Sequence, residues 1–473
     1  MEKRICLREH SSVWLVNETD AIAANLPEEA FAALANVQSK KFRKDVYCFA
    51  ISPKGGGYEL RADYFIGLDW LGETDYSVYV EPKVNAKAFE HYKEVLDAEK
   101  EEDIAPFDKK EQEAPKNLRE LNFLRMLLEV MAVPEAAENV SELVQIDFNA
   151  KPIPIPDIQD HLTPFLVVQF LQLLRSIVRK GLRKGYYKVT ENLTNRVKGK
   201  ILVGQHLRQN VFKNRFTQTL CEYQVFGIDT PENRFLKKVL QFASGYVENQ
   251  QSIFGDNLSK VQHLIYYARP AFEWVGDAVE MRELRQGKPN PLFREYGEAI
   301  KIGSLLLRRF GYNISKTISG KEATVPPFWI DMPGLFERYV YAKLLEANPE
   351  TKSAIHFQFP TYGNKLDFLI TDSENPMIID AKYKMCYESG KVIHTDIRQV
   401  AGYARLNKVL DKISGWDKDK VLPCLIVYPV PKYSAIEPSL RIASLISESK
   451  NLPAYHKVYR LGIPVPFQVQ RID

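Results

Sequence analysis

The chain has 473 residues, of which 45% are hydrophobic and 26% charged, and its formal net charge at pH 7 is +4. This composition excludes a disordered or fibrous protein, and the length predicts two to four domains. The longest apolar stretch, residues 164–178, contains Gln169, Gln172 and Arg175 and therefore predicts a buried helix instead of a membrane span. The N-terminus lacks the apolar region of a secretory signal, so we expect a cytoplasmic protein without membrane contact.

The first hundred residues alternate in the manner of β-strands. Tyr, Phe, Ile and Val recur at period two in "YELRADYFIGLDW" (58–70) and "YSVYVEPKV" (76–84). We therefore predict a β-rich N-terminal module over residues 1–96. Residues 97–113 carry eight acidic and three basic side chains, which predicts an acidic linker or insertion over 97–117.

Helical periodicity dominates residues 118–320, for example in "NLRELNFLRMLLEVM" and in the run from Thr163 to Lys184. Residues 175–215 contain twelve Lys or Arg and one acid, Glu191, so we predict that this helical middle domain grips DNA phosphates. The alternative is a set of solvated helix edges paired with acids elsewhere. The predicted DNA-binding residues are Arg179, Lys180, Arg183, Lys184, Lys188, Arg196, Lys198, Lys200 and Arg208.

The last part of the chain, residues 321–473, follows the order α-β-β-α-β. A helix at 334–348 precedes two strand-like runs, and a helix at 396–410 precedes a strand at 424–430. This order predicts a mixed sheet flanked by helices. The expected fold is therefore a mixed α/β (α+β) multidomain protein.

Three charged residues stand on the two strand-like runs, "KLDFLI" and "PMIIDAKYK", which the turn formers "TDSENP" join. Asp380 and Lys382 are two residues apart, so both face one side of the strand, roughly 6.6 Å apart along it. If the strands pair, Asp367 converges with Asp380. Two carboxylates suit Mg²⁺, with Mn²⁺ as a substitute, and Lys382 can hold or deprotonate an attacking water. The pattern predicts a metal-dependent phosphodiesterase site.

Residues on two predicted helices extend this site. Glu337 is placed to serve as a third acidic metal ligand or as an orienting group, and Gln399 and Tyr403 share one helical face because they are four residues apart. The alternative is an ordinary surface hairpin whose Asp–Lys ion pair is worth at most about 1 kcal/mol. The predicted catalytic residues are Asp367, Asp380, Lys382, Glu337, Gln399 and Tyr403, and the predicted metal ligands are Asp367, Asp380 and Glu337.

This ordered series resembles the PD-(D/E)xK nuclease superfamily, in particular its branch with a QxxxY helix, although Leu366 replaces the proline before Asp367. Within that superfamily, "IIDAKYK" followed by "DIRQVAGYARL" resembles the McrC family, the nuclease subunit of McrBC-type modification-dependent restriction systems. "RVKGKI" (196–201), "DTPENRFLKKVL" (229–240) and the strands near residues 64–84 agree with the same family.

The resemblance implies a partner and a substrate. The partner is a McrB-like AAA+ GTPase oligomer that the N-terminal module docks on and that this subunit stimulates, and the substrate is double-stranded DNA carrying a modified base. The sequence contains no GxxxxGK[ST] phosphate loop, since "SGKEAT" (319–324) has Glu322 where Ser or Thr is required. GTP is therefore expected to bind the partner and not this chain.

Two alternative functions remain open from the sequence. The chain could be a stand-alone PD-(D/E)xK repair or recombination nuclease, or a catalytically silent DNA-binding adaptor of an AAA+ ring. The segment "DTPENR" also suggests a catalytic role for Asp229 or Arg234, whereas Thr230 as a helix cap and Pro231 as a first helical residue explain it structurally. The eight histidines form no HExxH or HxH pattern, so no histidine metal site is expected.

Overall fold

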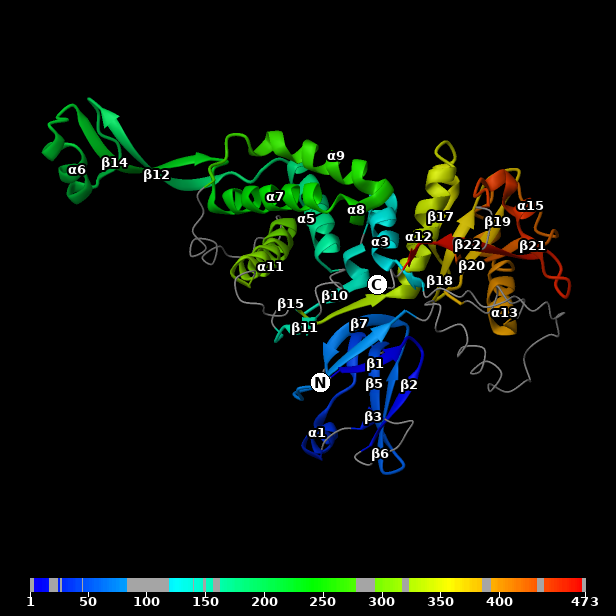
Figure 1. Ribbon diagram of the computed structural model, residues 1–473. Helices are drawn as coiled ribbons and strands as arrows, with labels where there is room; N and C mark the ends of the chain where they lie inside the picture. Colours follow the sequence, from blue (N-terminus) through cyan, green and yellow to red (C-terminus); the bar gives the residue numbers. More distant parts are fainter. Residues whose placement is uncertain are drawn as a thin grey trace. The chain divides into compact units, whose positions relative to one another are not determined.

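The computed structural model is a mixed α/β protein with several sheets and helices (Figure 1). It describes residues 4–16, 24–25, 28–44, 46–82, 119–138, 140–147, 150–155, 162–277, 294–316, 323–384, 393–431 and 438–469. The predicted acidic linker at 97–117 lies outside these ranges. Two compact units are present, one of Met1–Ile155 with Thr324–Asp473 and one of Pro156–Ala323. The domain boundaries predicted after residues 96, 117 and 320 remain predictions.

Two five-stranded sheets form part of the first unit. The first has the order β1-β8-β7-β16-β10, with strands Arg4–Arg8, Ser77–Glu81, Phe65–Trp70, Phe328–Asp331 and Val144–Ile146. The second has the order β3-β2-β6-β5-β4, with strands Ala24–Asn25, Ser12–Val16, Gly57–Ala62, Val46–Lys54 and Lys40–Arg43. Side chains from both sheets share one core, which includes Leu15, Phe49, Leu60 and Val78. The strands predicted within 58–70 and 76–84 are confirmed, with a break between β6 and β7.

Strand β16 connects the first of these sheets to the C-terminal part of the unit. It pairs antiparallel with β7, so that Asp331 stands opposite Phe65. Helix α12 (Met332–Ala347) begins directly after it, and the Asp331 carboxylate caps this helix by accepting a hydrogen bond from the Gly334 N–H at 3.0 Å. The predicted helix at 334–348 is confirmed, and its start is fixed by a strand of the N-terminal sheet.

A six-stranded mixed sheet forms the C-terminal part of the first unit. Its order is β17-β18-β19-β20-β22-β21, with strands Ile355–Pro360, Lys365–Ile370, Met377–Ala381, Cys424–Pro431, Val458–Val465 and Lys450–Asn451. The pairs β17–β18 and β18–β19 are antiparallel, and the pairs β19–β20 and β20–β22 are parallel. The strands predicted around 365–370, 377–381 and 424–430 are confirmed. Strands β17, β21 and β22 were not predicted from the sequence.

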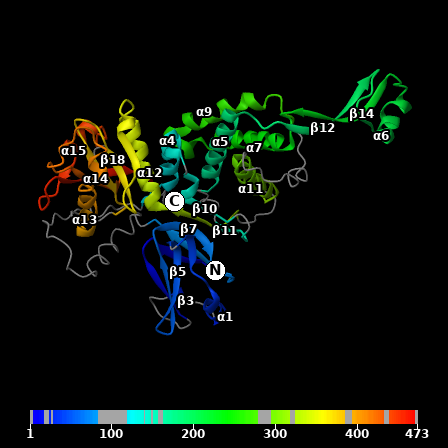
Figure 2. The same cartoon turned by 180° about the vertical axis from the view of Figure 1, so that it is seen from behind.

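Two helices follow β19 along the chain and pack beside it (Figures 1 and 2). Helix α13 (His394–Tyr403) buries Ile397, Val400 and Tyr403 in one apolar cluster with Leu366 and Ile378 of the sheet. Helix α14 (Asn407–Leu410) is separate, because the chain turns at residues 404–406. The prediction of a single helix at 396–410 is therefore wrong at residues 404–406.

The segment predicted as one helix from Asn117 to Met131 begins with a strand. Residues Arg119–Leu121 form β9, which pairs with β23 (Phe467–Val469) at the other end of the chain. Helix α3 (Phe123–Ala132) starts only afterwards, capped by the Asn122 side chain, which accepts a hydrogen bond from the Arg125 N–H at 2.9 Å. A pairing between segments this distant in sequence overrides local helix preference.

The second unit combines helices with a small sheet. The helices are α5 (Leu162–Lys180), α6 (Val203–Gln209), α7 (Pro231–Asn249), α8 (Gln251–Phe254), α9 (Leu258–Ala268) and α11 (Arg294–Lys316). Strands β12 (Gly185–Thr194), β14 (Gln218–Gly227) and β13 (Lys200–Ile201) form a sheet in the order β12-β14-β13. The helical prediction for this region is thus wrong at 185–194, 200–201 and 218–227, and in the first of these Tyr, Val and Leu alternate with polar residues at period two.

The remaining short elements are α1 (Glu28–Ala33), α4 (Pro134–Ala137), α15 (Leu445–Glu448), β11 (Ile153–Ile155), β15 (Ala323–Val325) and the 3-10 helices η1 (Leu34–Asn36), η3 (Val140–Leu143), η5 (Val211–Lys213), η6 (Gly255–Asn257), η7 (Arg269–Phe272), η9 (Lys352–Ala354) and η11 (Ile442–Ser444). The predicted buried helix at 164–178 is confirmed within α5, where Phe165, Leu166, Phe170 and Leu174 are buried. Within the described residues, no helix combines the length and apolar composition needed to cross a membrane.

Candidate active site

Two neighbouring strands of the C-terminal sheet, β18 and β19, bring three predicted site residues together. Asp367 lies on β18 and Asp380 on β19, and the Ala381 N–H donates a hydrogen bond to Asp367 Oδ2 at 2.8 Å. The Lys382 ammonium pairs with Asp380 Oδ2 at 2.8 Å. Asp380 is buried, with 1% of its side chain exposed, whereas 17% of Lys382 is exposed. Burial of the flanking apolar residues fixes the strands, and the charged groups gather where the strands end.

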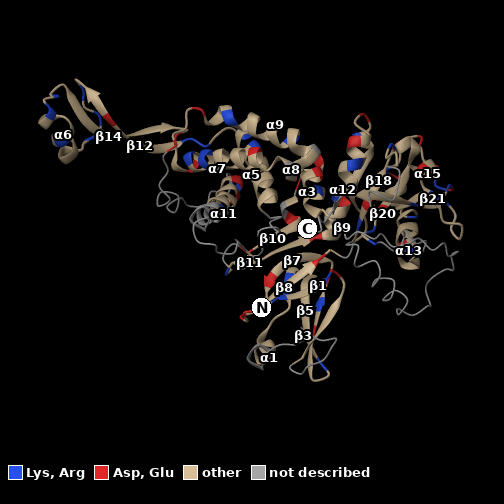
Figure 3. Ribbon diagram, in the orientation of Figure 1, with Lys and Arg blue, Asp and Glu red and all other residues tan. Residues whose placement is uncertain are grey.

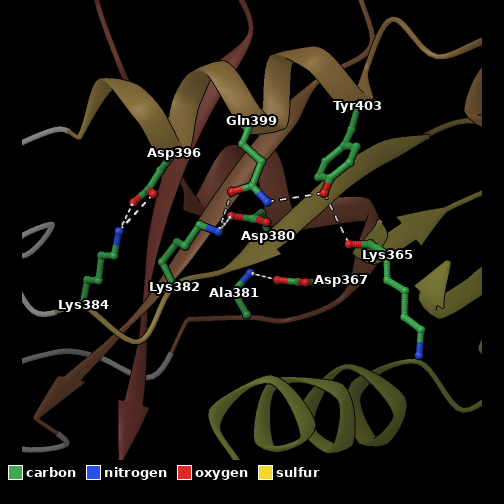
Figure 4. A network of polar contacts seen from close by, with 9 residues as sticks. All are labelled: Lys365, Asp367, Asp380, Ala381, Lys382, Lys384, Asp396, Gln399 and Tyr403. Atoms are coloured by element: carbon green, nitrogen blue, oxygen red, sulfur yellow. Dashed lines mark hydrogen bonds and ion pairs between the residues drawn. The ribbon is translucent and has the colours of Figure 1, made fainter. Parts of the chain in front are cut away.

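Helix α13 supplies the next two predicted residues to the same cluster (Figure 4). Lys382 Nζ donates to Gln399 Oε1 at 3.0 Å, and Gln399 Nε2 donates to Tyr403 Oη at 3.3 Å. Tyr403 Oη in turn donates to the Lys365 carbonyl at 3.4 Å. The spacing of four residues therefore places both side chains on one helical face, as the sequence predicts.

Glu337 reaches the site from α12. Its half-buried carboxylate is hydrogen-bonded to the Gln358 side chain, and it lies close enough to Asp380 and Lys382 to interact with both charges. The structure thus assembles the six predicted residues from helix α12, from strands β18 and β19 with the residue that follows β19, and from helix α13. Their assignment as catalytic residues stays a prediction.

Burial and mutual repulsion shift the ionisation of the carboxyl groups. Desolvation, followed by the charges of Glu337 and Asp380, raises the pKa of Asp367 to about 8. Desolvation and then Asp331 raise the pKa of Glu337 to about 7. Desolvation also raises the pKa of Asp380. The same cluster would be relieved by a bound cation, since a cation favours the ionised carboxylates.

Lys382 remains positively charged in this cluster. Desolvation by itself would lower its pKa, but the adjacent Asp380 and the charge of Asp367 outweigh that effect and raise the pKa above the usual value. The ammonium group is therefore protonated at neutral pH in the protein without metal. It can supply charge and hydrogen bonds to an anionic substrate.

The donor set at the strand ends fits Mg²⁺. Among the described residues, no group of three or more His, Cys, Asp or Glu is arranged to hold a metal ion. Mg²⁺ commonly takes one or two protein carboxylates and completes its shell with water and substrate oxygens. Asp367 Oδ1 and Asp380 Oδ1 make no hydrogen bond or ion pair within the described part of the chain, so each carboxylate keeps an oxygen for such a role.

A second ion pair next to the site was not predicted from the sequence. Lys384 Nζ donates to both carboxylate oxygens of Asp396 at 3.0 and 2.9 Å, which joins the end of β19 to the first turn of α13 (Figure 4). Asp396 is 6% exposed, and its charge also acts on Asp380 and Lys382. Two features of the sequence could have indicated this ion pair: a second lysine two residues after Lys382, and an acidic residue three residues before Gln399.

Residues of the N-terminal sheets also contact elements that carry the site. Arg43 pairs with Asp331, the cap of α12. The buried Tyr383, which follows Lys382, donates a hydrogen bond to Glu9 Oε2 at 3.4 Å. No sequence pattern links these residues, because each pair spans about 290 or more positions.

The predicted DNA-binding residues lie in the second unit, at the end of α5, on β12 and β13, in the turn between these strands and on α6; Figure 3 shows basic positions on α6 and near α7. Three of them face acids: Lys180 pairs with Glu295, Arg183 with Glu232 at 3.6 Å and Lys188 with Glu222 at 3.5 Å. Lys198 lies over the Tyr223 ring at 4.1 Å. The exposed ones without a carboxylate partner in the described residues are Arg179, Lys184, Arg196, Lys198, Lys200 and Arg208.

The "DTPENR" segment forms a structural junction in the second unit. Thr230 caps α7 by accepting a hydrogen bond from the Asn233 N–H, with Pro231 at the first helical position, as predicted. Asp229 binds Arg234 through two hydrogen bonds of 2.7 and 2.6 Å. Asn233 is fully buried and donates to the carbonyls of Arg183 and Ile228. These contacts give the segment a structural role, since they hold the connection between β14 and α7 in place.

Comparison with known proteins gives a family match. Residues 140–413 match the family described as McrBC 5-methylcytosine restriction system component. A search of curated proteins gives no match. Among solved structures, a half-complex from a tetradecameric assembly of Thermococcus gammatolerans McrB AAA+ hexamers with bound McrC is 14% identical, covering 97% of this chain and 94% of that chain with a TM-score of 0.38. The Thermococcus gammatolerans McrBC complex is 14% identical, covering 73% and 88%, with a TM-score of 0.26.

Proposed function

The chain belongs to the family of McrBC 5-methylcytosine restriction system components, and from this membership we propose that it is the DNA-cleaving subunit of such a system. In this proposal, the C-terminal sheet and its helices form a PD-(D/E)xK nuclease domain that hydrolyses phosphodiester bonds with Mg²⁺. The observation that carries it is the cluster of Asp367, Asp380 and Lys382, with Gln399 hydrogen-bonded to the lysine. The family description supports DNA with a modified base as the substrate.

Asp367 and Asp380 would hold the Mg²⁺ ion, with Glu337 as a further oxygen donor. When bound, the ion supplies charge stabilisation at the phosphate and lowers the pKa of a coordinated water. Lys382 contributes a protonated ammonium group at the same place, and Gln399 Oε1 fixes that group from the side of α13. Tyr403 fixes the Gln399 amide, so the lysine is oriented before DNA arrives.

Lys382 acts in this mechanism as a cation and not as the base that accepts the proton of the water. Its raised pKa keeps Nζ protonated at neutral pH, as derived above from Asp380 and Asp367. A fixed positive charge stabilises the extra negative charge that forms on a phosphate during attack. Removal of this charge is therefore expected to slow cleavage without preventing DNA from binding.

The proposed partner is a McrB-like AAA+ GTPase oligomer that binds GTP and is stimulated by this chain. Family membership supports this proposal, as does the lack of a GxxxxGK[ST] loop in the chain itself. The exposed basic residues Arg179, Lys184, Arg196, Lys200 and Arg208 are proposed to contact DNA phosphates, in which case binding weakens steeply as salt rises.

A cleavage assay tests this function against its alternatives. The purified chain is incubated with 5-methylcytosine-containing and unmethylated plasmids, with Mg²⁺, and with or without the McrB-like GTPase and GTP. The proposal predicts cleavage of the methylated plasmid only when the GTPase and GTP are present. Cleavage by the chain alone would instead favour a stand-alone nuclease.

The variant Asp380→Ala separates a cutting subunit from a silent adaptor. Cleavage should disappear while stimulation of GTP hydrolysis persists, and that persistence also shows that the variant is folded and assembled. A matched control is Asp419→Ala, which changes an exposed aspartate of the same unit. Wild-type protein that stimulates GTP hydrolysis but never cuts methylated DNA would overturn the nuclease proposal.

A further inference from the structure

A chain of polar contacts continues past the predicted site residues and includes two that no sequence motif marks. From Asp380 it runs through Lys382, Gln399 and Tyr403 to the Lys365 carbonyl. Lys365 Nζ then donates to Gln358 Oε1 at 3.4 Å, and the Gln358 side chain is hydrogen-bonded to Glu337. Lys365 and Gln358 thus join the two sides of the site.

Lys365 lies at the start of β18, two residues before Asp367. Residues two apart on a strand face the same side of the sheet, roughly 6.6 Å apart along the chain, so Lys365 and Asp367 share one face. Its side chain is exposed, and within the described residues it pairs with no carboxylate. An ammonium group has three N–H donors, and the single contact with Gln358 leaves two for a ligand.

Gln358 has a backbone conformation that is rare inside a strand. Its φ is 49°, in the left-handed region, although Phe357 and Phe359 on either side pair with Phe368 and Leu366 in regular antiparallel register. That register places Gln358 opposite Asp367. A left-handed residue other than glycine is strained and persists only where surrounding contacts enforce it, commonly at functional sites.

The neighbourhood of Lys365 suits an extended polyanion. The β17–β18 connection presents Tyr362, which is 73% exposed, and Lys408 Nζ lies 6.0 Å from the centre of its ring. Both Lys365 and Lys408 are exposed, so this edge of the domain presents positive charges outside the carboxylate cluster. A nucleic-acid backbone offers phosphates at regular spacing to such a row of cations, and a base or sugar can contact the ring.

We propose that Lys365 binds a DNA phosphate at the cutting site and that Gln358 is a positioning residue that holds the Lys365 ammonium group between Glu337 and the incoming backbone. This inference rests on the proposed function, because it takes DNA as the substrate. It adds a substrate contact within the nuclease domain, separate from the basic residues of the second unit.

Salt-dependent DNA binding tests the phosphate contact. The full chain carrying Asp380→Asn, which prevents cutting, is titrated with a fluorescent duplex at a series of salt concentrations. Each neutralised phosphate contributes about 0.9 to the slope of log affinity against log salt, so Lys365→Gln should reduce the slope by about that amount. Lys365→Arg should retain it, and Lys420→Gln, which removes an exposed lysine of the same unit, should leave it unchanged.

A double-variant comparison tests the positioning role of Gln358. Gln358→Ala should weaken binding and slow cleavage by the chain with its GTPase partner, but it should have little further effect once Lys365→Gln is present. A purely structural role would instead give effects that add. Equal salt slopes for the wild type and Lys365→Gln would overturn the inference, while continued wild-type cleavage of methylated DNA would leave the proposed function intact. Absence of wild-type cleavage would instead remove the proposed function itself.

Discussion

Replacement of Asp367 by Asn is expected to stabilise the metal-free protein although it removes a carboxylate that the proposed cleavage mechanism needs. The pKa of Asp367 is raised from 3.8 to about 8, first by burial and then by Glu337 and Asp380. A carboxyl with a raised pKa destabilises the folded state above its unfolded pKa, by an amount that grows until the pH passes the folded value. At pH 7, about three pH units above 3.8, this amounts to about 4 kcal/mol.

Asparagine keeps the shape of the side chain and an oxygen that can accept the Ala381 N–H, but it carries no charge. The gain in the free energy of unfolding is expected to be about 2–4 kcal/mol at pH 7. The range extends below the full value because the protonation of Asp367 is coupled to that of Glu337 and Asp380. The gain should be largest at pH 8 and above, and it should vanish below about pH 3, where the aspartate is protonated in both the folded and the unfolded state.

Urea or thermal unfolding without divalent cations measures this effect. Asp367→Asn should unfold several degrees above the wild type at pH 8, and the two should converge below about pH 3. The control Asp419→Asn, at an exposed position of the same unit, should follow the wild type at both pH values. A variant that is less stable than the wild type at pH 8, or equally stabilised at both pH values, would refute the reasoning.

Three further outcomes follow from the site. Mg²⁺ must displace protons from the site, because the pKa of Asp367 is raised to about 8 and that of Glu337 to about 7. Calorimetry should therefore find that the affinity for Mg²⁺ rises between pH 6 and 8 and that binding releases protons. An affinity that does not depend on pH would contradict this. Lys382→Gln should slow cleavage by the assembled enzyme about 100-fold or more while GTPase stimulation persists; near-normal cleavage would argue against its role. Gln358→Gly should relieve the left-handed backbone and raise the free energy of unfolding by about 1 kcal/mol, yet slow cleavage; a less stable variant would count against strain at this residue.

The local parts of the site could be predicted from the sequence. Strands β18 and β19 follow from apolar runs that are buried along almost their whole length, and the turn between them follows from Asp372, whose carboxylate accepts the Asn375 N–H at 2.9 Å. Period two places Asp380 and Lys382 on one face, and period 3.6 places Gln399 and Tyr403 on another. Such short-range relations depend on backbone geometry alone.

The parts that the sequence did not predict depend on distant partners. Strand β16 pairs with β7 and β10, which both come much earlier in the chain, so nothing near Asp331 indicates that the helix of Glu337 starts there. Gln358 combines its left-handed φ with side-chain contacts to Glu337 and Lys365, and a glutamine in a strand gives no sign of either. Strands β12 and β14 were hidden because their polar positions resemble the charged face of a helix.

The central claim is that Asp367 and Asp380 hold a divalent metal ion where DNA is cut. Anomalous diffraction from crystals of the chain grown with Mn²⁺ and a duplex tests it most directly. The account predicts an anomalous peak about 2.0–2.2 Å from a carboxylate oxygen of each of these two residues. A Mn²⁺ peak bound to other side chains, or no peak between these two carboxylates, would contradict it.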